Sequence, residues 1–186
     1  LKDLKDLKNK IFIELKKRIK DKDSSVPIKD GAFSYYSKYL ENSEYPQFLR
    51  IDKNNNEEVI LDADLKSKDF KFFNLSSVSH SHDHKYLAYN VDTNGSEHYN
   101  LSIEEIKTKK IITKKIENTT GEIIWHPNNK IIFYTVLDKN HRPNKIFAHQ
   151  IGSDPANDEL IYEEKDAAYF CYPSLSQSKE YLRSEE

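Results

Sequence analysis

The chain has 186 residues, of which 37% are hydrophobic and 32% charged, and 29 basic and 31 acidic side chains leave a formal net charge of −2. Both signs are mixed along the sequence, so no surface for nucleic acid or for acidic membrane lipids is predicted. The apolar runs are too short for a membrane-spanning helix, which needs about 20 residues. A mean hydropathy of −0.84 indicates a polar surface, but 12% aromatic residues argue against a disordered chain.

Cysteine usage favours a reducing compartment. Cys171 is the single cysteine and cannot form a disulfide within the chain. No charged-then-apolar leader precedes the first segment, which also favours a cytoplasmic protein. The chain contains no Met, so residue 1 need not be the native start.

Residues 1–22 are predicted to form one amphipathic helix. An apolar side chain recurs there at every third or fourth position, at Leu1, Leu4, Leu7, Ile11, Leu15 and Ile19. This spacing places them on one stripe of a helix. A helix on a membrane surface would show a similar stripe, but acidic residues are interleaved with the lysines, which favours packing of the stripe on protein.

From Gly31 onward the periodicity changes to short strands separated by turn residues, such as Asn54-Asn55-Asn56. Helix is expected only at the beginning of the chain. The predicted strands are Ala32–Tyr36, Pro46–Ile51, Val59–Leu61, Phe72–Val78, Tyr86–Val91, His98–Ile103, Lys110–Thr113, Glu122–Trp125, Ile131–Leu137, Lys145–Ile151, Glu159–Tyr162, Ala168–Tyr172 and Tyr181–Leu182.

The strands recur as similar sets about 45 to 50 residues apart, which is typical of β-propeller blades. The strand that begins Lys85-Tyr86 superposes on the one that begins Lys130-Ile131, and a polar turn such as Asp83-His84 precedes each copy. The predicted fold is therefore mainly β: a partial propeller of about three and a half four-stranded blades after one amphipathic α-helix. A β-sandwich is the alternative, because it also has many short strands.

The repeats also give predicted boundaries. The linking helix occupies residues 1–22, and the partial propeller occupies residues 31–186. The blades are expected at about 31–64, 70–114 and 121–164, with the start of a fourth at about 167–186.

Several strings, taken in order, make the chain resemble the oligopeptidase B (protease II) type of serine peptidase, within the prolyl oligopeptidase family. Their collinear order over nearly the whole chain carries the resemblance. The strings are Asp23-Ser24-Ser25-Val26-Pro27, Tyr35-Tyr36, Glu44-Tyr45-Pro46, Tyr89-Asn90-Val91-Asp92-Thr93-Asn94-Gly95, Glu117-Asn118-Thr119-Thr120-Gly121, Ile124-Trp125, Arg142-Pro143, His149, Gly152, Asp154-Pro155-Ala156 and Tyr162-Glu163-Glu164-Lys165-Asp166.

The resemblance implies a cytosolic peptidase that cleaves short peptides after Arg or Lys. It implies a seven-bladed propeller that excludes folded proteins from a site in an α/β-hydrolase domain, and this sequence lacks that domain. The expected partners of the complete enzyme are thus short basic peptides and the hydrolase domain. The incomplete ring would expose apolar blade faces. We expect the N-terminal helix, self-association or both to cover them.

No catalytic or cofactor-binding residue is predicted. A nucleophile elbow needs G-x-S-x-G, and none of the four glycines lies in such a frame. The resemblance places the triad in the hydrolase body. The alternative function is a freestanding truncated remnant or a protein-interaction module without peptidase activity. The Lys-, Asn- and Ile-rich composition, typical of a reduced AT-rich genome, weakly favours decay of the gene.

Three histidines, His80, His82 and His84, are weak metal candidates. Alternate residues of a strand share one face, so the three imidazoles could converge on a transition metal. The favoured interpretation is a solvated turn, because the stretch aligns with the turn before a propeller strand. In the family that turn commonly reads Pro-Asp-Gly, so His82 and His84 would take the Pro and Gly positions. Repeated aromatic residues, including Trp125, are expected to pack in the core rather than stack on bases, and Cys171 is expected to be buried.

Overall fold

A computed structural model describes residues 4–20 and 22–185 of the chain. Its internal contacts divide it into two compact units, residues 1–68 and 69–186. Leu1 of the predicted apolar stripe lies outside the described residues, as does Glu186 at the end of the predicted fourth blade. The blade boundaries drawn from the sequence remain predictions.

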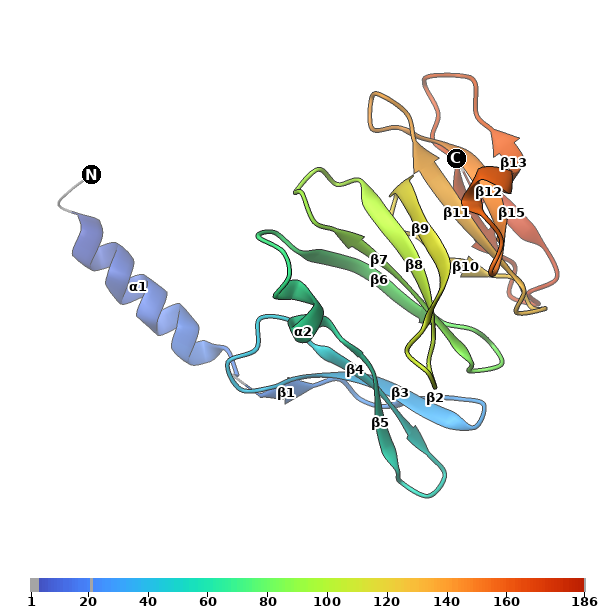
Figure 1. Cartoon of the computed structure of the whole chain (residues 1–186). Helices are drawn as coiled ribbons and strands as arrows, with labels where there is room; N and C mark the ends of the chain where they lie inside the picture. The colour runs from blue at the N-terminus through green and yellow to red at the C-terminus, as the bar shows by residue number, and fades with distance from the viewer. Residues whose placement is uncertain (1–3, 21, 186) are drawn as a thin grey trace. The chain divides into compact units, whose positions relative to one another are not determined.

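The first unit begins with helix α1 (Lys5–Arg18), coloured blue in Figure 1. Its apolar stripe is present, and the expected packing of this stripe on the rest of the protein stays a prediction. None of its side chains is buried, and Leu7 and Leu15 of the stripe are 53% and 54% exposed. An apolar stripe of this kind needs a partner surface, and the described residues of the first unit leave it uncovered.

The rest of the first unit is an antiparallel sheet in which β3 pairs with β4 and β4 with β5 (Figure 1). Asp52 closes the β4–β5 turn, because its carboxylate accepts hydrogen bonds from the backbone amides of Asn54 and Asn56 at 2.7 and 2.9 Å. The strands are β1 (Asp23–Ser24), β2 (Ile28–Asp30), β3 (Phe33–Tyr39), β4 (Gln47–Asp52) and β5 (Glu57–Asp62).

The sequence did not predict the short helix α2 (Ala63–Ser67) that follows β5. Asp62 starts this helix because its side chain accepts a hydrogen bond from the amide of Leu65 at 2.8 Å. Five residues are too few to show helical periodicity. A second departure from the all-strand expectation is the 3-10 turn η2 (Pro155–Asn157). In the described part of the chain, no helix has the length and apolar content needed to traverse a bilayer.

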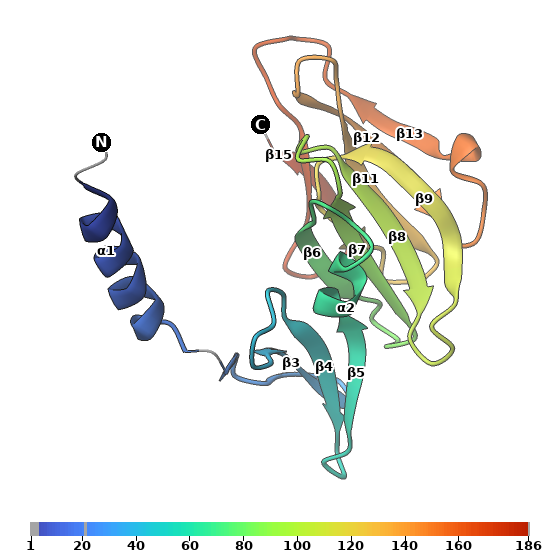
Figure 2. The same ribbon diagram turned by 60° about the vertical axis from the view of Figure 1, so that its left-hand side comes forward.

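The second unit contains an eight-stranded antiparallel sheet and a two-stranded hairpin. The order in the sheet is β13-β12-β11-β9-β8-β7-β6, with β10 paired to β11, and Figure 2 shows β13 as the outer strand beside β12. Its strands are β6 (Asn74–His80), β7 (Tyr86–Asp92), β8 (Tyr99–Glu105), β9 (Ile111–Thr119), β10 (Ile124–Trp125), β11 (Ile131–Leu137), β12 (Pro143–Gln150) and β13 (Glu159–Glu163), and the hairpin is β14 (Tyr172–Leu175) with β15 (Leu182–Glu185).

Three hairpins of this unit close with the same turn. The amides of Ser81, His126 and Ser176 bond to the carbonyls of residues five positions later, at 2.9 Å in each case. The amides of His84, Asn129 and Lys179 bond back to those three residues, and each donor has a positive φ close to 60°. The turns predicted before the repeated strands are therefore confirmed.

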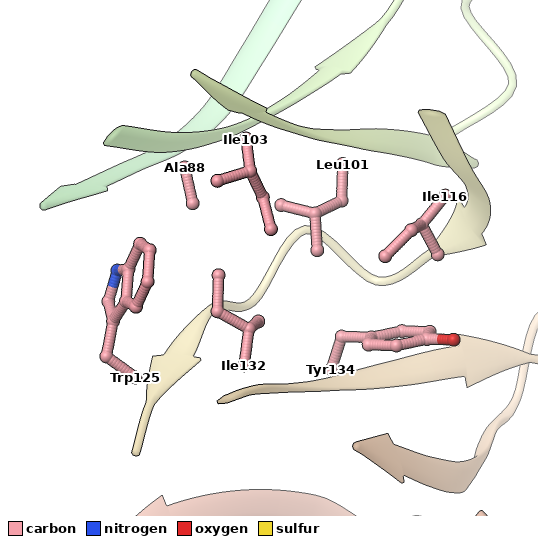
Figure 3. Packing of buried hydrophobic residues seen from close by; sticks show 7 residues of the cluster. All are labelled: Ala88, Leu101, Ile103, Ile116, Trp125, Ile132 and Tyr134. Carbon is pink, nitrogen blue, oxygen red and sulfur yellow. The ribbon is translucent and has the colours of Figure 1, made fainter. Parts of the chain in front are cut away.

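The core of the second unit lies between the strand set β6–β9 and the set β10–β13. Ala88, Leu101 and Ile103 point toward Ile132 and Trp125, as Figure 3 shows, and Ile116 and Tyr134 complete the cluster. Trp125 is 3% exposed, and its indole nitrogen donates to the carbonyl of Ser79 at 3.3 Å. Of the repeated aromatic residues, Trp125 and Tyr134 are buried as predicted, whereas Tyr181 of the last strand set is 67% exposed.

One strand prediction was wrong. Residues 168–171 do not begin a strand: a turn lies at 167–168, residues 169–171 are irregular, and β14 begins at Tyr172. The cause is Arg142, whose guanidinium donates to the backbone carbonyls of Asp166 and Tyr169 at 2.7 and 2.9 Å. Because these carbonyls face a side chain, they do not pair with a neighbouring strand.

Candidate functional site

The second unit contains a buried threonine, histidine and aspartate arranged like a catalytic triad. His149 of β12 places its Nδ1 atom 2.7 Å from Oδ1 of Asp158, which follows η2. Its Nε2 atom lies 3.1 Å from Oγ1 of Thr113 in β9. The order hydroxyl, imidazole, carboxylate is that of a serine-peptidase triad. Sequence reasoning identified no such set, because strand pairing alone brings these residues together.

This triad cannot act on a substrate. The residues Thr113 and His149 are 1% and 0% exposed, and the side chain of Asp158 is 3% exposed. No peptide can therefore reach the hydroxyl of Thr113. Thr113 Oγ1 also accepts from the amide of Gly152 at 3.1 Å, and Tyr134 donates its hydroxyl to Asp158 Oδ2 at 2.8 Å. Burial, followed by the bond to Asp158, raises the pKa of Tyr134. The group is a satisfied polar network that joins β9 to β11 and β12.

Cys171 is buried, as predicted. It is 1% exposed, and burial raises the pKa of its thiol. A buried thiol with a raised pKa has little thiolate and is a poor nucleophile.

The three histidines of the weak metal candidate do not share a strand. β6 ends at His80, and residues 81–85 form the turn in which His84 has a φ of 60°. The His80 and His84 rings lie 5.4 Å apart, and His82 Nε2 is buried without a hydrogen bond. The three-histidine site was proposed because alternate residues of a strand share one face. His82 and His84 lie in a turn, so this reason does not apply to them. Within residues 4–20 and 22–185, no three His, Cys, Asp or Glu side chains are grouped as metal ligands.

A cavity of about 260 Å³ opens at the side of the second unit where the β7–β8, β9–β10 and β11–β12 connections meet β14. We call it the loop-side cavity. Its lining combines two carboxylates, polar hydroxyls and aromatic rings, and consists of Glu97, Tyr99, Thr120, Glu122, Leu137, His141, Pro143 and Tyr172.

Two aspartates shape the loops that carry Glu97 and His141. The Asp92 carboxylate accepts hydrogen bonds from the amides of Asn94, Gly95 and Glu97 at 2.8, 3.0 and 2.8 Å. Burial alone would raise the pKa of Asp92, but these amide bonds outweigh it and lower the pKa. Asp138 likewise accepts from the amide of Asn140 at 2.8 Å in the next loop. Both loops thus have a fixed backbone.

The two loops meet through a histidine pair at the edge of the loop-side cavity. Nε2 of His98 lies 3.2 Å from Nε2 of His141, and the ring centroids are 4.3 Å apart. This distance fits a hydrogen bond between the two rings, with the donor set by their tautomers. A metal would need a third ligand, and the described residues group none with this pair.

The repeated antiparallel strand sets, and the buried interface between two of them, are those of a β-repeat domain. Over residues 1–184 the sequence matches the prolyl oligopeptidase N-terminal beta-propeller domain. The chain therefore belongs to the prolyl oligopeptidase family as an N-terminal β-propeller, which excludes the β-sandwich alternative.

Similar proteins agree with this assignment. Protease 2 of Moraxella lacunata is 29% identical over 96% of this chain and 27% of its own length. The structure of oligopeptidase B from Leishmania major superposes with a TM-score of 0.91 and 26% identity, over 97% of this chain and 26% of that one. Oligopeptidase B from Trypanosoma brucei with covalently bound antipain, in its closed form, gives a TM-score of 0.87 at 26% identity, over 97% of this chain and 26% of that one. The chain thus spans about a quarter of these relatives.

Proposed function

We propose that the chain is the first part of the propeller of an oligopeptidase B-like serine peptidase that cleaves short peptides after Arg or Lys. The continuous similarity to protease 2 and oligopeptidase B, over 96% and 97% of the chain, carries this proposal. In it, about three and a half blades follow helix α1. The single, buried Cys171 supports a cytoplasmic location.

The role proposed for the propeller is control of access. A closed ring of blades surrounds a tunnel, and relative domain motion admits short chains while folded proteins stay outside. Peptide bond cleavage would take place in an α/β-hydrolase domain beyond this chain. The burial of Thr113 and the raised pKa of Cys171 support a non-catalytic role for this segment.

Hydrolysis assays test this assignment. The purified 186-residue chain is expected not to hydrolyse Arg or Lys ester substrates. A version extended to the length of the relatives is expected to hydrolyse them and to prefer Arg and Lys over neutral residues, measured as kcat/KM. Turnover by the 186-residue chain that persists through further purification would overturn the assignment. Equal kcat/KM for neutral residues would overturn the Arg/Lys preference.

A freestanding remnant or interaction module is the second candidate. It is favoured by exposed apolar side chains such as Leu160 and Ile161 of β13, which a partner could cover. Nucleotide sequence downstream of the Glu186 codon separates the two: an open frame that reaches G-x-S-x-G supports the peptidase, and an early stop supports the module. Light scattering coupled to size-exclusion chromatography would detect the self-association that the module hypothesis includes.

A further inference from the structure

The connection between β7 and β8 contains the one Asn-Gly pair of the sequence, Asn94-Gly95. An asparagine followed by glycine is especially prone to deamidation, because glycine has no side chain that hinders the approach of its backbone nitrogen to the asparagine side chain. Both residues are exposed, so water reaches the pair and ammonia can leave it. The sequence and the exposure together indicate a chemical modification site in this loop.

The reaction needs no group from outside the chain except water. The Gly95 backbone nitrogen attacks Cγ of Asn94, and the side-chain amide leaves as ammonia together with the proton that the backbone nitrogen gives up. The five-membered succinimide then adds water at one of its two carbonyls and opens to aspartate or to isoaspartate. The attack requires a Gly95 nitrogen that is free to approach and a backbone that can rotate between the two residues.

Asp92 holds this nitrogen in the folded chain. Its Oδ1 atom accepts hydrogen bonds from the amides of Asn94 and Gly95 at 2.8 and 3.0 Å, and its Oδ2 atom accepts one from the amide of Glu97 at 2.8 Å. Asp92 is 1% exposed, so water hardly competes for these bonds. Burial alone would raise the pKa of Asp92, but the amide bonds outweigh it and lower the pKa, which leaves the carboxylate a weak base. Attack by Gly95 therefore requires local opening of the loop.

We propose that Asn94 is a deamidation site and that the Asp92 carboxylate sets the rate of the reaction by holding the Gly95 amide. An isoaspartate at this position carries the main chain through the former side chain and adds one methylene to the backbone. The loop then no longer matches the bonds to Asp92, and His98 loses its fixed place beside His141. The modification is a slow, one-way change that weakens the contact between the β7–β8 and β11–β12 loops.

Incubation of the 186-residue chain at neutral pH, followed by peptide mapping with mass spectrometry, tests the proposal. Aspartate and isoaspartate at position 94 are measured against time in the native chain and in chain unfolded in guanidinium chloride. The variant is Asp92→Ala, and the matched control is Asp138→Ala, which removes the corresponding aspartate of the β11–β12 loop. If Asp92→Ala does not fold, as judged by circular dichroism, Asp92→Asn takes its place, since it keeps the shape of the side chain and removes the charge.

Asn94 is expected to react at least about tenfold more slowly in the native chain than in the unfolded one, because hydrogen bonds to a charged acceptor oppose local opening. Asp92→Ala is expected to raise the native rate at least about fivefold, and Asp138→Ala to leave it unchanged. The proposal is overturned by equal rates in the native and unfolded chains, or by no product at position 94 in either. It is also overturned if the rate for the Asp92 variant equals that of the parent chain or of the control.

Discussion

Nδ1 of His149 lies 2.7 Å from Oδ1 of Asp158, and the two side chains are 0% and 3% exposed. Because Nδ1 donates to the carboxylate, Nε2 is left to accept from Thr113 Oγ1, 3.1 Å away. The hydroxyl in turn accepts from the amide of Gly152. A constellation associated with catalysis is used here to align strands from neighbouring sets.

Asp158→Asn is expected to lower the free energy of unfolding by about 2 kcal/mol, since a buried hydrogen bond to a charged group contributes about 1.5–3 kcal/mol. The matched control is Glu163→Gln, which breaks the half-exposed pair with Lys145 at 3.4 Å. A change below about 1 kcal/mol is expected for the control. Urea unfolding followed by Trp125 fluorescence measures both, and equal losses would contradict the structural importance of the buried network.

Gly121→Ala is expected to destabilise the second unit more than Gly152→Ala. A Cβ at Gly121 would lie 2.9 Å from Cβ of Ser76, in addition to the strain of a φ of +96°. At Gly152 the φ is +84°, but the nearest atom, on Ile112, would be 3.8 Å away. The difference between the two melting temperatures therefore reports the steric conflict alone. Adding Ser76→Gly should recover that difference, and failure to recover it would show that backbone strain dominates at Gly121.

Asp92 is expected to make stability depend on pH in the acid range. Its pKa is lowered in the folded chain, where amide bonds outweigh the effect of burial. Its stabilising contribution is therefore fully present above the unfolded pKa of about 3.9 and is lost as pH falls through the lower folded value. Urea midpoints between about pH 5 and pH 2 should fall less steeply for Asp92→Asn than for the parent chain. Parallel pH profiles would exclude this contribution.

Strands with a strong local signal could be predicted from the sequence. β11 begins and ends at the predicted Ile131 and Leu137, because a continuous apolar run buried on both faces leaves little ambiguity. β14 could not be placed, since the turn before it depends on Arg142, more than twenty residues away. Burial of Trp125 was predictable from its apolar neighbours, whereas Cys171 is buried although the strand predicted around it does not form and Phe170 beside it is exposed.

The polar sites depend on pairing that no local pattern encodes. Thr113 and His149 are 36 positions apart and meet only because their strands belong to one packed unit. The loop-side cavity draws on residues from Glu97 to Tyr172. The sequence does mark two loops of the cavity, because an aspartate ends or directly follows the preceding strand at Asp92 and Asp138. This pattern indicates a turn and not a ligand.

The recurring turns at Ser81, His126 and Ser176 have a consequence for the order of folding. Each is closed by hydrogen bonds between residues three and five positions apart, so none of them needs a distant partner. Local contacts carry a small loop-closure entropy and form quickly, whereas the interface between strand sets needs both sets in place. During synthesis, each hairpin can therefore close as soon as it emerges. The slow event is then the docking of one strand set on the next, in the order of their translation.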